Sequence, residues 1–389
     1  MSQRLISLSA DLVRLRDDGY DVETIADFLV LKHVPYVTPS REVAYGTLVS
    51  RLELSGDVTV RPSDHVAFFA GETPCDADGQ PLSKIINSSG HQVLAEGVEI
   101  DHTFSSKPDG GYVDYHQKMT TYVSLVSRFA RQLEPQATAT TFPVYDDDDE
   151  DPRFAYSDTA STRAQISVFS DRLRDYRIAI VGLGGTGAYV LDLVVKTPVR
   201  EIHLYDGDRF VQHNAFRAPG APGREQLVGV PQKVEYWAQQ YSRMKRDVVP
   251  HDCYIDEENV ELLRDMSFVF VAVDDGAARR LIVESLEEYG VAFIDTGMGV
   301  YEGEDALAAV LRVTTSSPTY RAAKSRMPFV TAAPDDYDRN IQVADLNALN
   351  GALAVIKWKK LAGFYADLGR EHQTLYTVSD NEIVNEEQA

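Results

Sequence analysis

The sequence predicts an α/β fold with a doubly wound, largely parallel sheet, preceded by a smaller α+β domain. Ile178 to Val181 form a short apolar run, and a cluster of glycines and the apolar-rich stretch Tyr189 to Val195 follow at once. A second short run, Glu201 to Tyr205, ends at an aspartate. Short apolar runs that alternate with helical stretches are typical of buried parallel strands. The N-terminal part differs, because Tyr20 to Leu54 has the composition of β-structure broken by turns.

The first elements of the chain predict an α+β domain over residues 1–143. Residues 2–18 have helix-like apolar spacing closed by Gly19, and His65 to Phe69 is a further strand. Tyr115 to Phe129 has helical character. This part is similar to an uncharacterised bacterial domain, a resemblance that implies no mechanism.

An acidic run, YDDDDEDP from Tyr145 to Pro152, predicts the boundary between the domains. Like charges in a block repel one another and resist folding, so a solvated linker is expected over residues 144–160. An acidic patch for a basic partner is the alternative. The second domain is expected over 161–389, with a helical stretch from Ser157 to Tyr176 leading into it.

Glycines after the first strand predict a site for a phosphorylated ligand. Gly182, Gly184, Gly185 and Gly187 let backbone N–H groups approach a phosphate, and the helix N-terminus favours anions. Asp206 follows about 20 residues later, where a Rossmann-like unit places an acid on the ribose hydroxyls. Such a glycine motif alone indicates an NAD-dependent oxidoreductase as readily as any other nucleotide-binding enzyme.

Charged residues beyond Asp206 favour ATP over NAD. The chain continues with Asp208, Asn214, Arg217 and Lys233, and a predicted strand from Phe268 to Val273 ends at Asp274 and Asp275. Cations would neutralise a triphosphate, and a carboxylate would hold Mg²⁺. Asp275 is expected near a helix start, where its charge favours the helix dipole, although the two aspartates could also form an acid–base pair. The chain contains no GxxxxGK[ST] motif, which disfavours γ-phosphoryl transfer by a P-loop.

The remaining elements complete the predicted sheet. VVPHDCYI, residues 248–255, is a third strand, and Val291 to Ile294 is another that ends in the sequence DTG. That tripeptide also occurs in aspartic proteases, an alternative that a single copy supports weakly. Leu307 to Val313 is a further strand and Thr314 to Asn340 a long polar loop. An apolar helix follows from Ala344 to Leu361, and the tail from Asn381 is expected to fray.

The motifs GLGGTG, DGDRFVQHNAFR, VAVDDG and FIDTGMG, with Lys233 between the second and third, resemble the adenylation domain of the ThiF/MoeB/ubiquitin-activating (E1) superfamily over roughly residues 161–365. The resemblance implies that Gly184 and Gly185 line the nucleotide and that Asp206 holds the ribose. It implies that Asn214, Arg217 and Lys233 face the phosphates. It makes Asp274 the Mg²⁺ ligand.

The same resemblance implies an activity, ATP-dependent adenylation of a carboxylate with release of pyrophosphate. The substrate would most commonly be the C-terminal glycine of a ubiquitin-like protein, handed on to an E2-like or sulfur-transfer partner. A homodimer is implied, with the helix Ala344 to Leu361 at its interface and Arg163 reaching the partner's ATP. The long loop would form the acyl-substrate channel. Adenylation of a small molecule or modified nucleoside, an NAD-dependent oxidoreductase and a non-catalytic binding module remain alternatives.

The two cysteines bear on a covalent thioester step. Cys75, in TPCDADG, is either an acyl-accepting nucleophile on an exposed loop or a small turn residue. Neighbouring Asp76 and Asp78 would raise the pKa of its thiol and disfavour the thiolate. Cys253 is expected to be structural, and no cysteine follows it where E1 enzymes carry theirs. No paired CxxC motif occurs, so no zinc is expected.

Composition excludes several classes of partner. The chain has 389 residues, with 38 basic and 60 acidic side chains, for a formal net charge of −22. That balance argues against a nucleic-acid partner. Charges occur too early for a signal peptide, and no apolar run reaches the length of a membrane span. The sequence therefore predicts a cytoplasmic protein without a membrane partner.

Overall fold

The computed structural model describes residues 2–147, 151–164, 166–329 and 341–387, and the chain divides into two compact units. The first unit comprises residues 1–150 and 156–164, and the second comprises 151–155 and 165–389. The chain therefore contributes one short segment to the second unit before it returns to the first. The boundaries drawn from the sequence at 143 and 161 stay a prediction.

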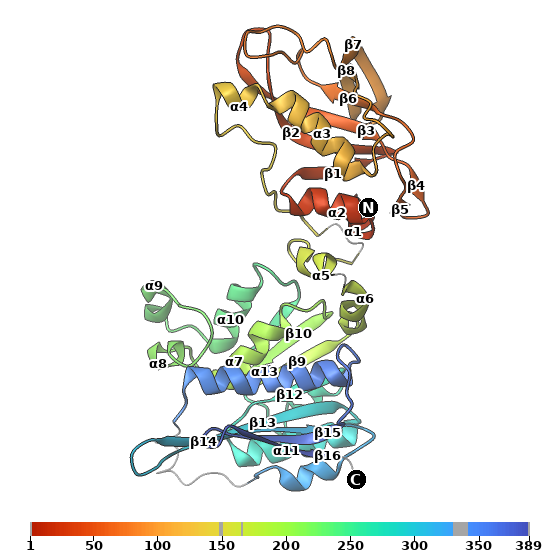
Figure 1. Cartoon of the computed structure of the whole chain (residues 1–389). Coiled ribbons are helices and arrows are strands. Elements are labelled where there is room, and N and C mark those ends of the chain that lie inside the picture. The colour runs from red at the N-terminus through yellow and green to blue at the C-terminus, as the bar shows by residue number, and fades with distance from the viewer. Residues whose placement is uncertain (1, 148–150, 165, 330–340, 388–389) are drawn as a thin grey trace. The chain divides into compact units, whose positions relative to one another are not determined.

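The first unit is built on a six-stranded antiparallel sheet with the order β1-β2-β3-β6-β8-β7. Helix α3 packs on β2 and β3, and α1 packs on β1 (Figure 1). The elements are α1 Ser2–Leu8, α2 Ala10–Asp17, β1 Asp21–Ile25, β2 Phe28–Val37, β3 Val43–Arg51, β4 Leu54–Ser55, β5 Val58–Thr59, β6 Val66–Ala70, β7 Ile86–Ala95, β8 Val98–Ser105, α3 Tyr115–Ser127, α4 Ala130–Leu133 and α5 Thr159–Arg163. This arrangement confirms the predicted α+β class.

Two local predictions for this unit were wrong. Residues 2–18 do not form one helix, because Ser9 takes an extended conformation between α1 and α2, and its hydroxyl accepts a hydrogen bond from Thr59 N at 3.0 Å. Ser157 to Tyr176 does not form one helix either. The described residues of that stretch form α5, the four-residue α6 Ser167–Ser170 and a 3-10 turn, Asp171–Leu173.

Cys75 is buried, contrary to the exposed nucleophile that its loop suggested. The residue is 0% exposed, and its Sγ donates a hydrogen bond to Thr73 O at 3.3 Å. Backbone bridges join Cys75 to Val37 and Pro81 on either side. Burial raises the pKa of the Cys75 thiol, and the charges of Asp76 and Glu72 raise it further. The structure therefore makes Cys75 a core residue with little thiolate.

The ends of the predicted linker are held by hydrogen bonds within the units. The Tyr145 hydroxyl accepts from Val22 N at 3.1 Å and donates to Tyr20 O at 3.0 Å in the first unit. In the second unit, the buried Lys245 ammonium donates to Arg153 O at 3.0 Å. Residues 148–150 of the acidic run lie outside the described residues. Tyr145 and Arg153, on either side of the run, are thus each held by hydrogen bonds, whereas a fully solvated linker would have none.

The second unit is built on an eight-stranded sheet with the order β11-β10-β9-β12-β13-β14-β15-β16. Neighbours from β11 to β13 are parallel, and those from β13 to β16 are antiparallel. The remaining elements of this unit are β9 Arg177–Val181, α7 Gly185–Val194, β10 Glu201–Tyr205, α8 Gln212–Ala215, α9 Arg224–Val228, α10 Lys233–Tyr241, β11 Val248–His251, η2 Val260–Leu263, β12 Phe268–Val271, α11 Gly276–Tyr289, β13 Ala292–Glu302, β14 Leu307–Ser316, η3 Ala322–Arg326, α13 Ala344–Leu361, β15 Glu371–Thr377 and β16 Glu382–Glu387.

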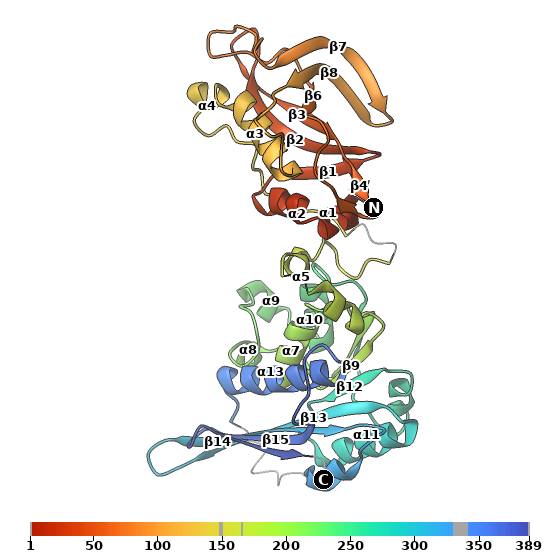
Figure 2. The same cartoon turned by 45° about the vertical axis from the view of Figure 1, so that its right-hand side comes forward.

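Alternate residues of the parallel strands feed two apolar cores, one on each face of the sheet. Ile178 and Ile180 of β9 pack with residues of α7, α10 and α13. Ala179 and Val181 pack on the other face with residues of η2 and α11. Figures 1 and 2 show α7 and α13 side by side on one face, with α11 beyond the sheet. The predicted doubly wound α/β class is confirmed. No described helix has the length and apolar character needed to cross a membrane.

The C-terminal third departs from the sequence-based prediction in two places. β13 does not end at Ile294 but runs on through the DTG sequence to Glu302, because β14 pairs with it over that whole length. The tail from Asn381 does not fray, since Glu382–Glu387 forms β16 against β15. Of the predicted loop Thr314 to Asn340, residues 330–340 lie outside the described residues.

We expect the Cys75 thiol to react slowly in the folded protein because it is enclosed and holds its proton. In a Cys253→Ser variant, an aromatic disulfide reagent should label Cys75 at least about 100-fold more slowly in buffer than in denaturant. The wild type, with the partly exposed Cys253, is the control. Equal rates with and without denaturant would show that Cys75 is accessible after all.

Candidate functional site

A cavity of about 470 Å³ lies at the carboxyl ends of the parallel strands. The chain passes from β11 at one edge of the sheet to β12 on the far side of β9, so the strand order reverses between β9 and β12. In open α/β sheets, ligands bind in the crevice at such a reversal. The cavity's lining comprises Val181, Gly182, Gly184, Gly185, Thr186, Tyr205, Asp206, Asp208, Arg217, Lys233, Tyr254, Ile255, Ala272, Val273, Asp274, Asp275, Ala278, Arg279, Ile282, Thr296, Gly297, Met298, Gln342, Asn347 and Asn350.

The glycines between β9 and α7 are needed mainly for close packing. Gly182 has φ +89°, and a Cβ on it would overlap the carbonyl of Ala272 after β12. A Cβ on Gly187 would overlap the carbonyl of Gly182. Gly184, the N-cap of α7, differs, because a Cβ there would meet no protein atom within 4 Å. Gly184 therefore leaves room on the cavity side, where the N-terminus of α7 attracts anions.

Asp206 and Asp208 follow β10 and share one lysine. Asp206 Oδ2 accepts from Leu183 N at 2.7 Å, and its Oδ1 accepts from Asp208 N at 2.8 Å. Lys233 Nζ, at the start of α10, lies 2.6 Å from Asp208 Oδ2 and 3.4 Å from Asp206 Oδ2. Tyr254 donates its hydroxyl to Asp208 Oδ1. The glycine turn, β10 and α10 are thus tied together by one pair of carboxylates.

The two carboxylates have opposite pKa shifts. Burial raises the pKa of Asp206, and the charge of Lys233 opposes that rise without cancelling it. Burial also favours a higher pKa at Asp208, but hydrogen bonds from Lys233 and Tyr254 outweigh it and lower the pKa. A buried carboxylate of raised pKa gains from new hydrogen-bond donors, such as ribose hydroxyls.

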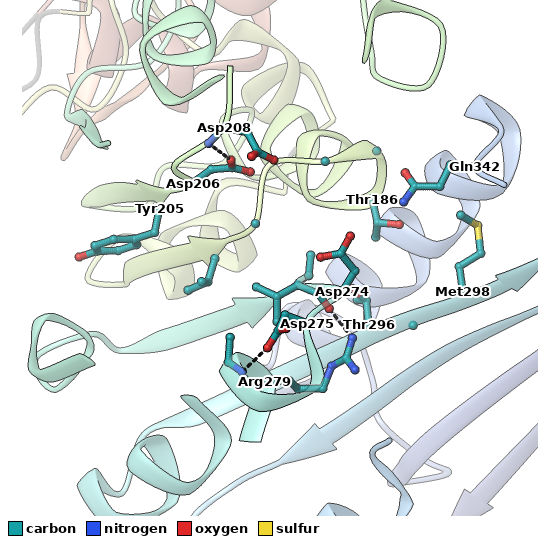
Figure 3. A pocket seen from close by; sticks show the side chains of 18 of the residues that line it. Thr186, Tyr205, Asp206, Asp208, Asp274, Asp275, Arg279, Thr296, Met298 and Gln342 are labelled. Carbon is teal, nitrogen blue, oxygen red and sulfur yellow. Dashed lines mark hydrogen bonds between the residues drawn. The ribbon is translucent and has the colours of Figure 1, made fainter. Parts of the chain in front are cut away.

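Arg217 and Asp274 face the same cavity from different segments. Arg217 is half-buried, and its Nε has no hydrogen-bond partner among the described residues. Burial lowers the pKa of Arg217, and Asp274, Asp208 and Asp206 oppose the shift in that order. Asp274 follows β12 and points into the cavity (Figure 3). A guanidinium with an unpaired buried N–H is suited to binding an anionic ligand.

Asp274 and Asp275 have separate roles. Asp275 caps α11, because its Oδ1 accepts from Ala278 N at 2.7 Å, which confirms its predicted place at the helix start. It is thereby occupied and does not form an acid–base pair with Asp274. Among the described residues, no cluster of three or more His, Cys, Asp and Glu side chains could hold a metal by itself. In proteins, Mg²⁺ is usually bound by one or two carboxylates together with phosphate oxygens and water, and Asp274 could supply such a carboxylate.

The structure brings most of the predicted site residues to the cavity but not all of them. Asn214 is buried outside its lining, and its Oδ1 accepts from Val211 N at 2.8 Å to cap α8. Gly187 lies in the first turn of α7 and is not part of the lining. Arg163 belongs to the first unit, where its Nε lies 3.5 Å from Asp17 Oδ2 and its side chain is 75% exposed. The roles predicted for these residues, and for those in the cavity, stay predictions.

Sequence reasoning missed the contribution of α13. Its residues Asn347 and Asn350, both buried, line the cavity, together with Gln342 just before the helix. Asn350 Nδ2 donates to Gly297 O at 3.1 Å, which leaves its Oδ1 without a partner among the described residues. In Figure 3, Thr186, Gln342 and Met298 lie together at the opposite end of the cavity from Tyr205. Two asparagines within an otherwise apolar helix were the signal that could have identified this wall.

The aspartate of the DTG sequence serves the structure of the sheet. Asp295 is 0% exposed, with Arg279 Nε 3.1 Å from its Oδ1 and Arg312 2.6 Å from its Oδ2. Two guanidinium groups on one carboxylate leave a net positive charge beside the cavity, which Arg279 lines. A carboxylate enclosed in this way is not available for proteolytic acid–base chemistry.

Tyr205 links the cavity to a pair of histidines at the edge of the sheet. The His251 ring stacks on Tyr205 at 4.4 Å, and its Nε2 lies 2.9 Å from His203 Nδ1. His203 Nε2 lies 2.9 Å from Glu201 Oε2. Since the ionised carboxylate only accepts, His203 donates to Glu201 and accepts from His251. Burial lowers the pKa of His251 below its ordinary value of 6.5, and the neighbouring His203 lowers it further.

Comparisons with known proteins match each part of the chain to a family model. The ThiF family model matches residues 158–374, and a domain of unknown function, DUF6791, matches residues 10–159. Ubiquitin-like modifier-activating enzyme 5 of Branchiostoma floridae is 24% identical over 160 residues. That match covers 38% of this chain and 38% of the relative, so the chain spans well under half of that protein's length.

Two solved structures are similar in fold. The structure of PaaA shares 17% identity at a TM-score of 0.45, covering 59% of this chain and 84% of its own. The structure of E. coli MccB with ATP shares 16% identity at a TM-score of 0.45, covering 57% of this chain and 66% of its own.

We expect His251 to make the folded protein less stable in acid. Its pKa is lower in the folded than in the unfolded state, so as the pH falls below about 6.5 the unfolded state takes up a proton first. Replacing it with phenylalanine keeps the stacked ring and removes this loss. Denaturant unfolding of wild type and His251→Phe at pH 7.5, 6.5 and 5.5 should show a flatter pH profile for the variant. Parallel profiles would show that His251 does not cause the loss of stability in acid.

Proposed function

Because this chain belongs to the ThiF family, whose model matches more than half of it, we propose that it adenylates a carboxylate with ATP. One observation carries the proposal. Arg217, Lys233 and Asp274, from three separate segments, line one cavity beside the glycine turn and Asp206. The set combines two cations for phosphates, a free carboxylate for Mg²⁺ and an acid placed for ribose hydroxyls.

In the proposed reaction, a carboxylate oxygen of the substrate attacks the α-phosphorus of ATP. The new O–P bond forms as the bond to the β-phosphate oxygen breaks, so pyrophosphate leaves and an acyl-adenylate remains. Arg217 and Lys233 would stabilise the negative charge that develops there. Lys233 already lies against Asp208, so binding of the triphosphate would draw its ammonium from that carboxylate. Mg²⁺ held by Asp274 would neutralise phosphate charge.

The same residues disfavour the alternatives that the sequence left open. A dinucleotide site for NAD needs the glycine turn and Asp206 but not Arg217, Lys233 and Asp274 in one cavity. Loss of Asp206, Arg217, Lys233 or Asp274 would have favoured a binding module without catalysis, and all four line the cavity. Adenylation of a small molecule or modified nucleoside uses the same chemistry and differs only at the acyl end of the cavity.

The part of the cavity lined by β13, where the acyl substrate would enter, supports a polypeptide substrate. β12 pairs with β13 only as far as Asp295, whereas β14 pairs with β13 as far as Glu302. Among the described strands, none pairs with the β12-side edge of β13 beyond Asp295. Thr296, Gly297 and Met298 of that stretch line the cavity. An unpaired strand edge leading into the site suits an extended chain that ends in a carboxylate. We therefore propose the C-terminal glycine of a ubiquitin-like protein as the substrate.

The cysteines support transfer of the acyl group to a separate partner. Cys75 is enclosed, and burial raises the pKa of Cys253 as well, with Asp256 and Asp252 adding to the rise. Neither thiol is placed and ionised as an acyl acceptor. We propose that the adenylate is received by an E2-like or sulfur-transfer protein.

A homodimer is proposed from the outer face of α13. Leu349 and Ile356 lie two helical turns apart and are 37% and 44% exposed, and Leu346, three residues before Leu349, is partly exposed. Such a stripe on a surface helix is typical of a helix that packs against another. Arg163 would then reach a neighbouring subunit's ATP, as the family resemblance implies.

Removing either charged group at the phosphates should abolish adenylation. Exchange of labelled pyrophosphate into ATP, measured with a ubiquitin-like substrate, should fall about 100-fold or more in Arg217→Ala and in Asp274→Ala. Arg243→Ala, an exposed position outside the cavity, is the matched control and should keep the wild-type rate. Absence of exchange together with tight NAD binding would identify a dehydrogenase site instead.

The substrate's last residue should decide whether exchange occurs. Candidate ubiquitin-like proteins that end in glycine should support exchange, and the same proteins shortened by that glycine should not, because their carboxylate would stop short of the α-phosphorus. Each shortened protein is compared with its full-length parent. Equal exchange with both forms would rule out recognition of the C-terminal glycine.

A further inference from the structure

The side-chain amide of Asn347, on α13, lies where three segments of the second unit meet. Its Nδ2 donates to the backbone carbonyl of Arg217 at 3.2 Å. Its Oδ1 accepts from the Thr186 hydroxyl in the first turn of α7 at 3.0 Å. The residue is 1% exposed. One amide group therefore joins α13, the start of the nucleotide-binding helix and the residue that carries the phosphate-facing guanidinium.

The bond to Arg217 holds a segment that has little regular structure. Residues 216–223 contain two glycines and two prolines between the short helices α8 and α9, and Phe216 beside Arg217 is 78% exposed. The Arg217 amide N–H bonds only locally, to Asn214 O at 3.1 Å. Asn347 thus connects the packed core of the unit to the backbone of Arg217. A hydrogen bond at this point limits where the guanidinium can lie.

The approach of Asn347 also explains why position 185 is a glycine. A Cβ on Gly185 would overlap the Nδ2, Cγ and Oδ1 atoms of Asn347, which are its three nearest neighbours. Gly185 is the first residue of α7 and has no positive φ, so an alanine would suit its backbone. The obstacle to a side chain there is the amide of Asn347. The side chain of Asn347 therefore requires a glycine at position 185.

We propose that Asn347 is a positioning residue for the triphosphate of ATP and acts through its hydrogen bonds to Arg217 and Thr186. It fixes Arg217 relative to the N-terminus of α7, the two groups that face the phosphates. Asp206, expected at the ribose, is held by Leu183 N, Asp208 N and Lys233, whereas the side chain of Asn347 is bonded to Thr186 and Arg217. Loss of Asn347 should therefore weaken binding of the triphosphate and spare binding of the nucleoside. This inference rests on the proposed ATP site.

The first test compares two ligands on the full-length protein. Titration calorimetry with ATP and Mg²⁺ should give a dissociation constant about 10-fold higher for Asn347→Ala than for wild type, the effect of one lost hydrogen bond. The dissociation constant for adenosine should change less than about 2-fold. The ATP-to-adenosine ratio is the readout, because partial unfolding would lower the active fraction for both ligands alike. Asp345→Ala, exposed in the first turn of α13, is the control and should keep the wild-type ratio.

The second test uses the packing of Gly185 against Asn347. Gly185→Ala alone should weaken ATP binding, because its methyl group would displace the amide. In the double variant Gly185→Ala/Asn347→Ala that methyl meets no amide, so its ATP affinity should equal that of Asn347→Ala. Additive losses in the double variant, or an unchanged ATP-to-adenosine ratio in Asn347→Ala, would overturn the inference. A wild type that binds neither ligand would instead overturn the proposed function.

Discussion

The close approach of backbone to backbone around the glycine turn is the constraint on which the second unit depends. The turn after β9 must pass directly beneath the carbonyl of Ala272, and the first turn of α7 must pack directly on Gly182. A side chain at Gly182 or Gly187 would separate the strands from the helix. Because the cavity lies at the ends of β9, β10 and β12, the residues that follow these strands depend on this contact for their position.

The electrostatics of the site follow from that geometry in a chain of strongly acidic composition. The formal charge is −22, yet Arg217, Lys233, Arg279 and Arg312 gather at or beside one cavity. Lys233, Arg279 and Arg312 each contact a carboxylate, and the charge of Asp274 acts on Arg217 without an ion pair between them. The cations of the site are therefore already oriented. Preorganised charges of this kind act on a phosphate without a large rearrangement, which is the condition under which electrostatic stabilisation is most effective. A protein with a strongly negative net charge can therefore still hold a cluster of cations that binds phosphate.

Much of the site could be predicted from the sequence because its residues adjoin strand ends. A buried parallel strand must end at the ligand-binding edge, so Asp206 after β10 and Asp274 after β12 were recognisable from position alone. Asp275 as a helix cap was equally local. The burial of Cys75 could not be predicted, for the opposite reason. Its loop is rich in Gly, Pro and Asp, but bridges to Val37 and Pro81 fold that loop inward, and such pairing is invisible in the local sequence.

The sequence by itself determined the α/β class and identified Arg217, Lys233 and Asp274, which the structure brings to one cavity. Both depend on short-range patterns of apolar and charged residues, which each segment carries alone. That these three residues face phosphates stays a prediction. Only the tertiary structure decided that α13 supplies a wall of the cavity, that Asn347 requires a glycine at position 185, and that Asp295 is neutralised by two arginines. The reason is physical, since those contacts join residues on different helices and strands, some of them more than a hundred positions apart, and no local pattern encodes the distance between them.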